Sequence, residues 1–146
     1  MSESIVVGTD GSETARRAVG EAIRIASALG AQVHVVCAYE RTRVTPVDPG
    51  PGGRPVPAMV DDQMVDAKLS AAAASAREAG VEFKTHAVRL DPADALLSVA
   101  DEVGASMIVV GNQGMHGAKR VLGSVPNSVS HKARCNVLIV STDERA

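Results

Sequence analysis

The stretch SIVVGTDGSETARRAVGEAIRIASALG, residues 4–30, decides the fold because it holds a complete strand, turn and helix. Residues 4–9 are a short run rich in β-branched side chains, which is typical of a buried strand. The run stops at Asp10-Gly11-Ser12, a turn-forming sequence. From residue 13 to residue 29, apolar residues recur at intervals of three and four, which predicts an amphipathic helix. Gly30 follows where a glycine commonly ends a helix.

The same alternation of strand and helix continues along the chain. Further strands are predicted at residues 32–39, 81–90, 105–110 and 136–141, and further helices at residues 58–79, 92–103 and 124–133. The order βαβαβαβαβ predicts one α/β domain over residues 1–146, Rossmann-like, with an open five-stranded parallel sheet and helices on both faces. Between residues 41 and 57, five of the seven prolines and three glycines break the pattern. We expect a flexible surface loop there rather than a functional lid.

The amino-acid composition argues against several classes of function. Hydrophobic residues make up 45% of the 146 residues, mainly Ala and Val, and the only aromatic residues are Tyr39 and Phe83. A formal net charge of −2 and the scarcity of aromatic side chains argue against nucleic acid as a partner. Without a signal-like N-terminus or a long apolar run, we expect a cytoplasmic protein that does not enter membranes. Cys37 and Cys135 lie in or beside strand-like runs and are expected to be buried thiols.

Two loops at the ends of predicted strands differ from ordinary connections. The first is residues 8–12, after the first strand; the second begins at residues 111–114, after the fourth strand, and ends at Gly123-Ser124. Ligands of open parallel sheets bind beyond the carboxyl ends of the strands, so the loops converge if these strands are neighbours. Glycines allow close backbone approach, and a helix N-terminus favours an anion. The loops predict a phosphate or nucleotide site, unless the glycines only shape a tight turn.

Side chains in these loops have more than one interpretation. Ser124 either caps the last helix, the commoner role for serine at such a place, or donates its hydroxyl to a phosphate oxygen. Asp10 either contacts a ligand or only shapes its turn. The loops match neither a P-loop, since Gly-x-x-x-x-Gly-Lys-Ser/Thr is missing, nor the Gly-x-Gly-x-x-Gly fingerprint of dinucleotide sites.

Catalysis has little support in the sequence. The four histidines show neither metal-ligand spacing nor the order of a known triad. His34 falls in a core strand and His131 on a short helix, which favours structural or surface roles, whereas His116 lies in the glycine-rich loop and could touch a phosphate. We therefore expect no catalytic residues, no metal ligands from the protein, and at most slow hydrolysis.

Three motifs resemble those of a known family. They are Val-Gly-Thr-Asp-Gly-Ser at residues 7–12, Val-Val-Gly-Asn-Gln-Gly at residues 109–114 and Gly-Ser-Val-Pro-Asn-Ser-Val at residues 123–129. Together they are similar to the universal stress protein family, and the similarity covers essentially the whole chain. The family's nucleotide signature is Gly-x2-Gly-x9-Gly-Ser/Thr, and the matching residues are Gly111, Gly114, Gly123 and Ser124. Here eight residues, not nine, precede the third glycine. We expect the shorter loop to take a different path and to keep its anion site.

The resemblance implies the strand order 3-2-1-4-5, a fold similar to the adenine nucleotide alpha hydrolases, and an adenine nucleotide bound across strands one and four. Asp10 would hydrogen-bond the adenosine portion, and the backbone around Ala38 would border the adenine. The nucleotide-binding residues that it implies are Gly8, Thr9, Asp10, Ala38, Val110, Gly111, Asn112, Gly114, Gly123, Ser124 and Val125. ATP is the expected ligand, with AMP or cyclic AMP as alternatives, and its phosphates could carry Mg²⁺.

The last strand indicates a partner. It would lie at a sheet edge, it is apolar, and it contains no Lys or Pro that would discourage pairing. The resemblance implies a homodimer joined through Val137, Leu138, Ile139 and Val140. The functions that stay open are a stress-response regulator that binds ATP or cyclic AMP, a nucleotide-independent dimeric interaction module, and a slow ATPase.

Overall fold

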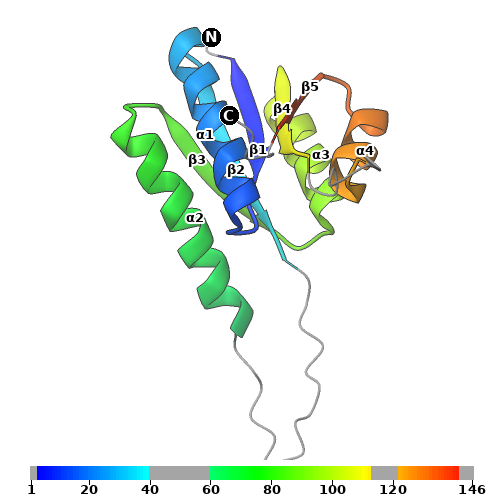
Figure 1. Ribbon diagram of the computed structural model, residues 1–146, viewed down its shortest axis with the longest axis horizontal. Helices are drawn as coiled ribbons and strands as arrows, with labels where there is room; N and C mark the ends of the chain where they lie inside the picture. The colour runs from blue at the N-terminus through cyan, green and yellow to red at the C-terminus, as the bar shows by residue number, and fades with distance from the viewer. Residues whose placement is uncertain (1–2, 40–59, 113–121, 142–146) are drawn as a thin grey trace, which may run out of the picture.

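A computed structural model describes residues 3–39, 60–112 and 122–141, and its five strands form one parallel sheet (Figure 1). In chain order the elements are β1 (Ser4–Gly8), α1 (Glu13–Leu29), β2 (Gln32–Ala38), α2 (Val60–Glu78), β3 (Phe83–Val88), α3 (Pro92–Val103), β4 (Met107–Gly111), α4 (Ser124–Lys132) and β5 (Asn136–Val140). The strands lie side by side in the order β3-β2-β1-β4-β5, which confirms the predicted topology. The loop predicted at residues 41–57 lies outside the described residues.

Helices α1 and α3 have the predicted bounds because sequence-specific caps mark both of their ends. Ser12 Oγ accepts a hydrogen bond from the Ala15 N–H at 3.1 Å, and Gly30 ends α1 at φ 66°. Asp91 caps α3 in the same way, before a proline in the first turn, and a left-handed glycine ends that helix. The observed bounds of the strands differ more from the predicted ones. Strand β3 covers Phe83–Val88 instead of residues 81–90, and β4 covers Met107–Gly111 instead of residues 105–110.

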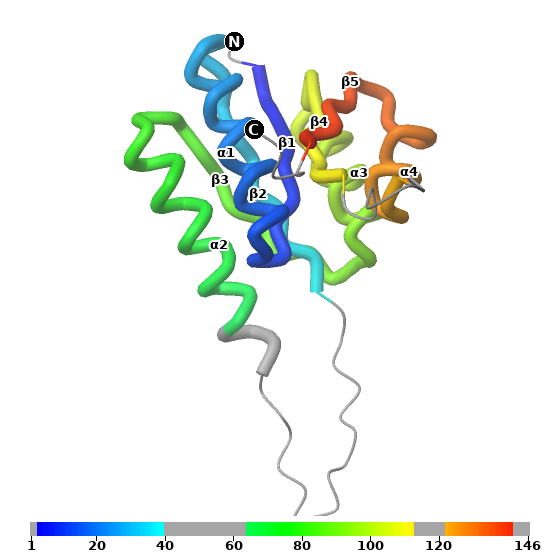
Figure 2. Tube along the Cα trace, viewed as in Figure 1, coloured from blue at the N-terminus to red at the C-terminus, as the bar shows by residue number. Residues whose placement is uncertain are grey.

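The sheet is buried between two layers of helices. Helices α1 and α2 cover one face, and α3 and α4 cover the other, as Figures 1 and 2 show. Alternate residues of each central strand point to opposite faces, so Val7 packs with α1 and α2 whereas Val6 packs with α3. Apart from His34 of β2, the buried residues of the central strands are therefore apolar, and small alanines of α1 allow that helix to pack closely.

The chain changes face between β1 and β4. The connection from β1 to β2 runs through α1 on one face, whereas the connection that arrives at β4 runs through α3 on the other face. β1 and β4 are direct parallel neighbours, with Ile5 opposite Met107 and Val7 opposite Val109. Such a reversal separates the loops that follow the two strands and leaves a crevice at their carboxyl ends.

Other expectations are met only in part. Both cysteines are free thiols, and Cys37 is buried as expected, but Cys135 is partly exposed. Within the ranges that the structure describes, no helix combines the length and the apolar character that crossing a membrane requires.

Candidate functional site

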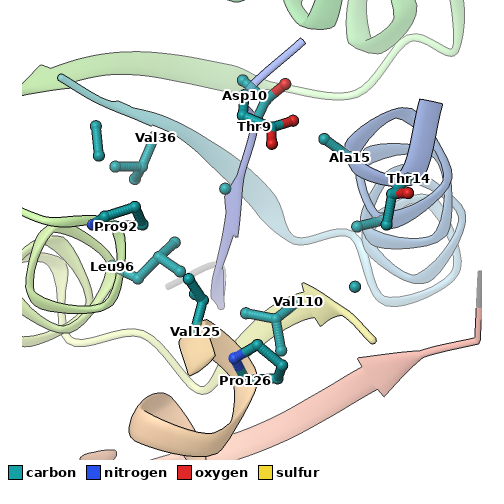
Figure 3. A pocket seen from close by; sticks show the side chains of 14 residues that line it. Thr9, Asp10, Thr14, Ala15, Val36, Pro92, Leu96, Val110, Val125 and Pro126 are labelled. Carbon is teal, nitrogen blue, oxygen red and sulfur yellow. The ribbon is translucent and has the colours of Figure 1, made fainter. Parts of the chain in front are cut away.

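A pocket of about 180 Å³ opens at the carboxyl ends of β1, β2 and β4 (Figure 3). The N-terminal parts of three helices, α1, α3 and α4, complete its walls. Its lining residues are Gly8, Thr9, Asp10, Thr14, Ala15, Ala18, Val36, Ala38, Pro92, Leu96, Val110, Gly111, Val125 and Pro126. The pocket therefore lies at the crevice that the change of face between β1 and β4 creates.

The turn between β1 and α1 places polar groups at the mouth of the pocket. The Ser12 N–H donates to Asp10 Oδ1 at 2.9 Å, and the Gly11 N–H donates to Thr9 Oγ1 at 3.2 Å. Gly11 has φ 80°, a left-handed conformation that side chains disfavour, and a Cβ there would lie 2.9 Å from Lys68 Cγ. The turn thus needs glycine at position 11, and Asp10 shapes it, which is one of the two roles considered for that residue.

Asp10 keeps its charge in this environment. Burial by itself raises the pKa of Asp10, but hydrogen bonds from Ser12 and the nearby Lys68 ammonium outweigh it, so that the pKa lies below its ordinary value. An ionised carboxylate accepts hydrogen bonds only. Asp10 could therefore accept from the hydroxyls of a sugar while it holds the turn.

The rest of the pocket is apolar. Among the lining residues, only Thr9, Asp10 and Thr14 have polar side chains. In Figure 3, Leu96 and Pro92 lie across the pocket from the first turn of α1. A Cβ added to Gly8 would lie 3.2 Å from Leu96 Cδ2, so this glycine lets α3 approach the end of β1. Aliphatic walls beside a few fixed polar groups suit a flat organic ring with a hydroxylated substituent.

The start of α4 borders the pocket through Val125 and Pro126. Gly123 is the N-cap residue, with φ −58° and ψ 161°, and no side chain in the described ranges caps the helix. The Asn127 N–H donates to the Gly123 carbonyl at 3.0 Å, and Pro126 has no N–H, so the amides of Ser124 and Val125 precede the first intrahelical bond. Of the two roles considered for Ser124, the structure does not bear out the cap, which was the commoner one: Ser124 is the first helical residue, as the predicted bounds had it, and its hydroxyl and amide stay available to an anion.

The structure brings most of the sequence-predicted site residues together. Seven of them line the pocket: Gly8, Thr9, Asp10, Ala38, Val110, Gly111 and Val125. Gly123 and Ser124 lie next to Val125 without lining it, and the Asn112 N–H donates to the Val140 carbonyl of β5 at 3.1 Å. Gly114, His116 and the intervening part of the glycine-rich loop fall outside the described residues.

Sequence reasoning missed half of the lining residues. They are Thr14, Ala15, Ala18, Val36, Pro92, Leu96 and Pro126. Val36 could have been found, because it points to the same face of β2 as Ala38, two positions later. Pro92 and Leu96 come from α3, whose position over the pocket depends on the tertiary packing. Over the described parts of the chain, no three His, Cys, Asp or Glu side chains gather as a metal site would require.

The fold and this pocket together define the class of the protein: an open α/β domain with a small-molecule pocket at the topological switch point of its sheet. Comparison with known proteins makes the class specific, because the model of the universal stress protein family matches residues 1–141. The chain belongs to the universal stress protein family.

Relatives support this membership over their full lengths. Universal stress protein Rv1636 of Mycobacterium tuberculosis is 37% identical, over 96% of this chain and 97% of its own. Universal stress protein YxiE of Bacillus subtilis is 32% identical, over 96% of this chain and 99% of its own.

Solved structures agree in fold. A crystal structure of a universal stress protein in complex with cAMP is 35% identical, covers 97% of this chain and 98% of its own, and has a TM-score of 0.75. The universal stress protein from Archaeoglobus fulgidus in complex with dAMP is 29% identical over 94% and 96%, with a TM-score of 0.68. Two structures similar to this chain thus hold adenine nucleotides.

Proposed function

We propose that this protein binds an adenine nucleotide in the pocket at the ends of β1, β2 and β4 and acts as a stress-response regulator. One observation carries the proposal: a mainly aliphatic pocket lies between the ionised Asp10 and the uncapped N-terminus of α4. This arrangement offers separate surroundings for a base, a sugar and a phosphate. The complexes of similar universal stress proteins with cAMP and dAMP support the same ligand class.

In this proposal, the adenine ring lies in the aliphatic part of the pocket, beside Ala38 and Val36. Asp10 accepts from ribose hydroxyls, and the glycine at position 111 leaves space for the sugar. The free amides of Ser124 and Val125, with the Ser124 hydroxyl, bind phosphate oxygens with the helix dipole in their favour. Gly8, Thr9, Asn112, Gly114 and Gly123 complete the proposed site.

We infer ATP as the physiological ligand, with AMP and cyclic AMP as alternatives; a similar universal stress protein has been solved in complex with cAMP. Any Mg²⁺ would be carried by the phosphates of the nucleotide rather than by the protein. Calorimetric titration of the purified protein with ATP, AMP and cyclic AMP, each with and without Mg²⁺, ranks these ligands. The absence of heat and of a thermal shift with all three nucleotides would reject the proposal.

A substitution that fills the pocket provides the matching structural test. Ala38→Leu adds three carbon atoms where the adenine is placed, and we expect the affinity for the nucleotide to fall at least about tenfold, since overlap leaves no room for the ring. Ala28→Leu adds the same atoms to an exposed position of α1 and serves as the control. Equal affinities of the two variants would place the nucleotide elsewhere.

A dimeric interaction module is a second candidate function, and β5 favours it. Among the strands that the structure describes, β5 pairs with β4 alone, and Val137, Leu138, Ile139 and Val140 are only partly buried. We propose that two copies join through this edge, as a two-fold symmetric pair. Light scattering should then report a dimer, and Leu138→Lys should dissociate it, whereas Thr85→Lys on the opposite edge strand should not. A monomeric wild-type protein at micromolar concentration would contradict this candidate.

A further inference from the structure

Two imidazole rings lie against each other where β2 meets the edge strand β3. His34 Nδ1 and His86 Nε2 are 2.9 Å apart, and the ring centroids are separated by 5.1 Å. His86 is the register partner of Val36, two residues beyond His34 on the face that α3 covers. His34 is 3% exposed, whereas His86 is partly buried. This pair joins a core strand to an edge strand, and the nucleotide proposal does not use it.

The two rings leave one nitrogen without a partner. His34 Nε2 is buried, and nothing in the described part of the chain forms a hydrogen bond with it. A bond between Nδ1 of His34 and Nε2 of His86 needs one N–H and one bare nitrogen. In the first arrangement, His34 Nδ1–H donates to His86 Nε2, and the buried Nε2 of His34 carries no hydrogen. In the second, His86 Nε2–H donates to His34 Nδ1, and neutral His34 then carries its hydrogen on Nε2, as a buried N–H without an acceptor. Both rings must be neutral for the first, less costly arrangement.

Proton uptake disrupts this arrangement whichever ring receives the proton. A proton on His34 puts a charged N–H at Nε2 in an apolar environment. A proton on His86 makes its Nε2 a donor, which forces His34 to move its own hydrogen to the buried Nε2. If both rings are charged, two N–H groups face each other across 2.9 Å and the hydrogen bond is lost.

The surroundings of the pair favour its neutral form. Burial lowers the pKa of His34, and the neighbouring His86 and Lys84 lower it further. Burial also lowers the pKa of His86, and Lys84 adds to this while Glu102 of α3 opposes it. On the side of the central sheet, β1 places only the apolar Val6 opposite His34. Among the described residues, Glu102 is thus the neighbouring charge that favours a proton, and it acts on His86.

We propose that His34 and His86 form a pH-sensitive latch, which holds the edge strand β3 to β2 while both rings are neutral and releases it when the pair takes up a proton. Because the unfolded chain binds a proton more readily than the folded pair, stability is complete above the unfolded pKa of about 6.5. It decreases as the pH falls below that value and continues to decrease down to the lowered pKa of the folded pair. Val36, the register partner of His86, lines the nucleotide pocket, so the latch adjoins one wall of that site.

Nuclear magnetic resonance of the wild-type protein tests the latch without any substitution. Nitrogen shifts of the rings at pH 8 should show His34 protonated at Nδ1, and both rings should respond together as the pH falls to 5. Over the same range, amide exchange corrected for intrinsic rates should speed up in β3, and in β1 only through global unfolding. Exchange in β5, at the opposite edge of the sheet, should not respond where its local opening leaves the pair intact. Each unit by which folding lowers the pKa of the pair corresponds to about a tenfold loss of protection against amide exchange in β3. Independent titration of the rings, or equal changes in β3 and β5, would overturn the proposal.

A variant then assigns the pH response to the pair. His86→Gln keeps an amide that can bond to His34 but cannot take up a proton in this range. We expect the melting temperature of the wild type to fall between pH 8 and pH 5, and His86→Gln to reduce that fall, because only the buried His34 of the pair is then left to titrate. His131→Gln changes an exposed histidine of α4 and should leave the fall intact. A His86→Gln variant that keeps the full fall overturns the proposal, and none of these measurements requires a nucleotide.

Discussion

Helices α1 and α4 both begin at the pocket, but the free backbone amides of their first turns have different partners. At the start of α1, Ser12 Oγ accepts from the Ala15 N–H at 3.1 Å, so the protein satisfies a donor of the first turn itself. At the start of α4, Gly123 supplies no side chain, and Pro126 removes one amide without satisfying the others. α3, the third helix at the pocket, resembles α1, because Asp91 caps it. A capped helix start contributes to stability, whereas an uncapped one keeps its donors for a ligand.

The difference between the two helix starts also matches the two ends of the proposed nucleotide, its sugar and its phosphate. The capped start of α1 belongs to a turn that is fixed by Gly11 and hydrogen-bonded to Asp10, and it presents a carboxylate that can accept from a sugar. The uncapped start of α4 presents donors, which suit the phosphate. Acceptor and donor groups therefore lie at different helix starts around one aliphatic pocket. This separation fixes the orientation in which a nucleotide would bind, with its sugar at α1 and its phosphate at α4.

The largest effect should follow from removal of a free amide of α4. Ser124→Pro deletes the N–H and hydroxyl of the first helical residue, and Pro suits this position because Gly123 is extended, with ψ 161°. A hydrogen bond to a charged group contributes about 1.5–3 kcal/mol, so nucleotide affinity should fall more than tenfold in calorimetric titration. Ser124→Ala keeps the amide and should lose less. Unchanged affinity in Ser124→Pro, with an unchanged melting temperature, would show that the phosphate is not bound at α4.

The next effect concerns the turn that precedes α1. Gly11→Ala should lower the free energy of unfolding by about 1–2 kcal/mol, because a side chain at φ 80° is strained and its Cβ also meets Lys68 Cγ. Urea denaturation at pH 7 measures the loss. The double variant Gly11→Ala with Lys68→Ala removes the crowding and keeps the backbone strain, so it should recover only part of the stability. Full recovery would mean that glycine is needed there for space and not for its conformation.

A pair of serine substitutions tests the comparison directly. Ser12→Ala should cost about 1 kcal/mol of unfolding free energy, the usual contribution of an N-cap side chain. Ser124→Ala removes the same hydroxyl from a helix start where it caps nothing, and stability should stay within about 0.5 kcal/mol of the wild type. Both values come from urea denaturation without nucleotide. Equal losses would show that Ser124 stabilises α4 after all, and would remove the contrast between the two helices.

The fold was predictable where the sequence carries local signals. The bounds of α1 and α3 follow from a cap residue before each helix and a glycine after it, and both were predicted to the residue. Strand ends lack such signals, because a strand ends where its neighbour stops pairing, and that depends on the register of the sheet. The strand order came from the family resemblance, and the structure confirms it.

The site was predictable only in part, for similar reasons. Glycines and Asp10 after β1 stand out in the sequence because few side chains tolerate such turns. The role of Ser124 stayed open between a cap and a phosphate ligand because the sequence leaves the first helical residue uncertain by one position; in the structure Gly123 takes the cap position. Leu96 reaches the pocket through tertiary packing of α3, and the approach of His34 to His86 depends on the register between β2 and β3. Neither contact can be read from sequence spacing.

The smallest expected effect is a pH dependence at the capped start of α3. Hydrogen bonding to the Asp94 amide lowers the pKa of Asp91 below its ordinary value, so the ionised carboxylate favours the folded state. This contribution is complete above the unfolded pKa of about 3.9 and is lost as the pH falls through the lowered value. Asp91→Asn keeps a capping oxygen without the charge, so its small deficit in stability at pH 7 should shrink toward pH 3. Urea midpoints of both proteins at pH 7, 5 and 3 measure the deficit. A deficit of the same size at every pH would mean that Asp91 stabilises the helix through its hydrogen bond and not through its charge. The starts of α3 and α4 would then differ in hydrogen bonding alone, although the first turn of α4 contains no carboxylate.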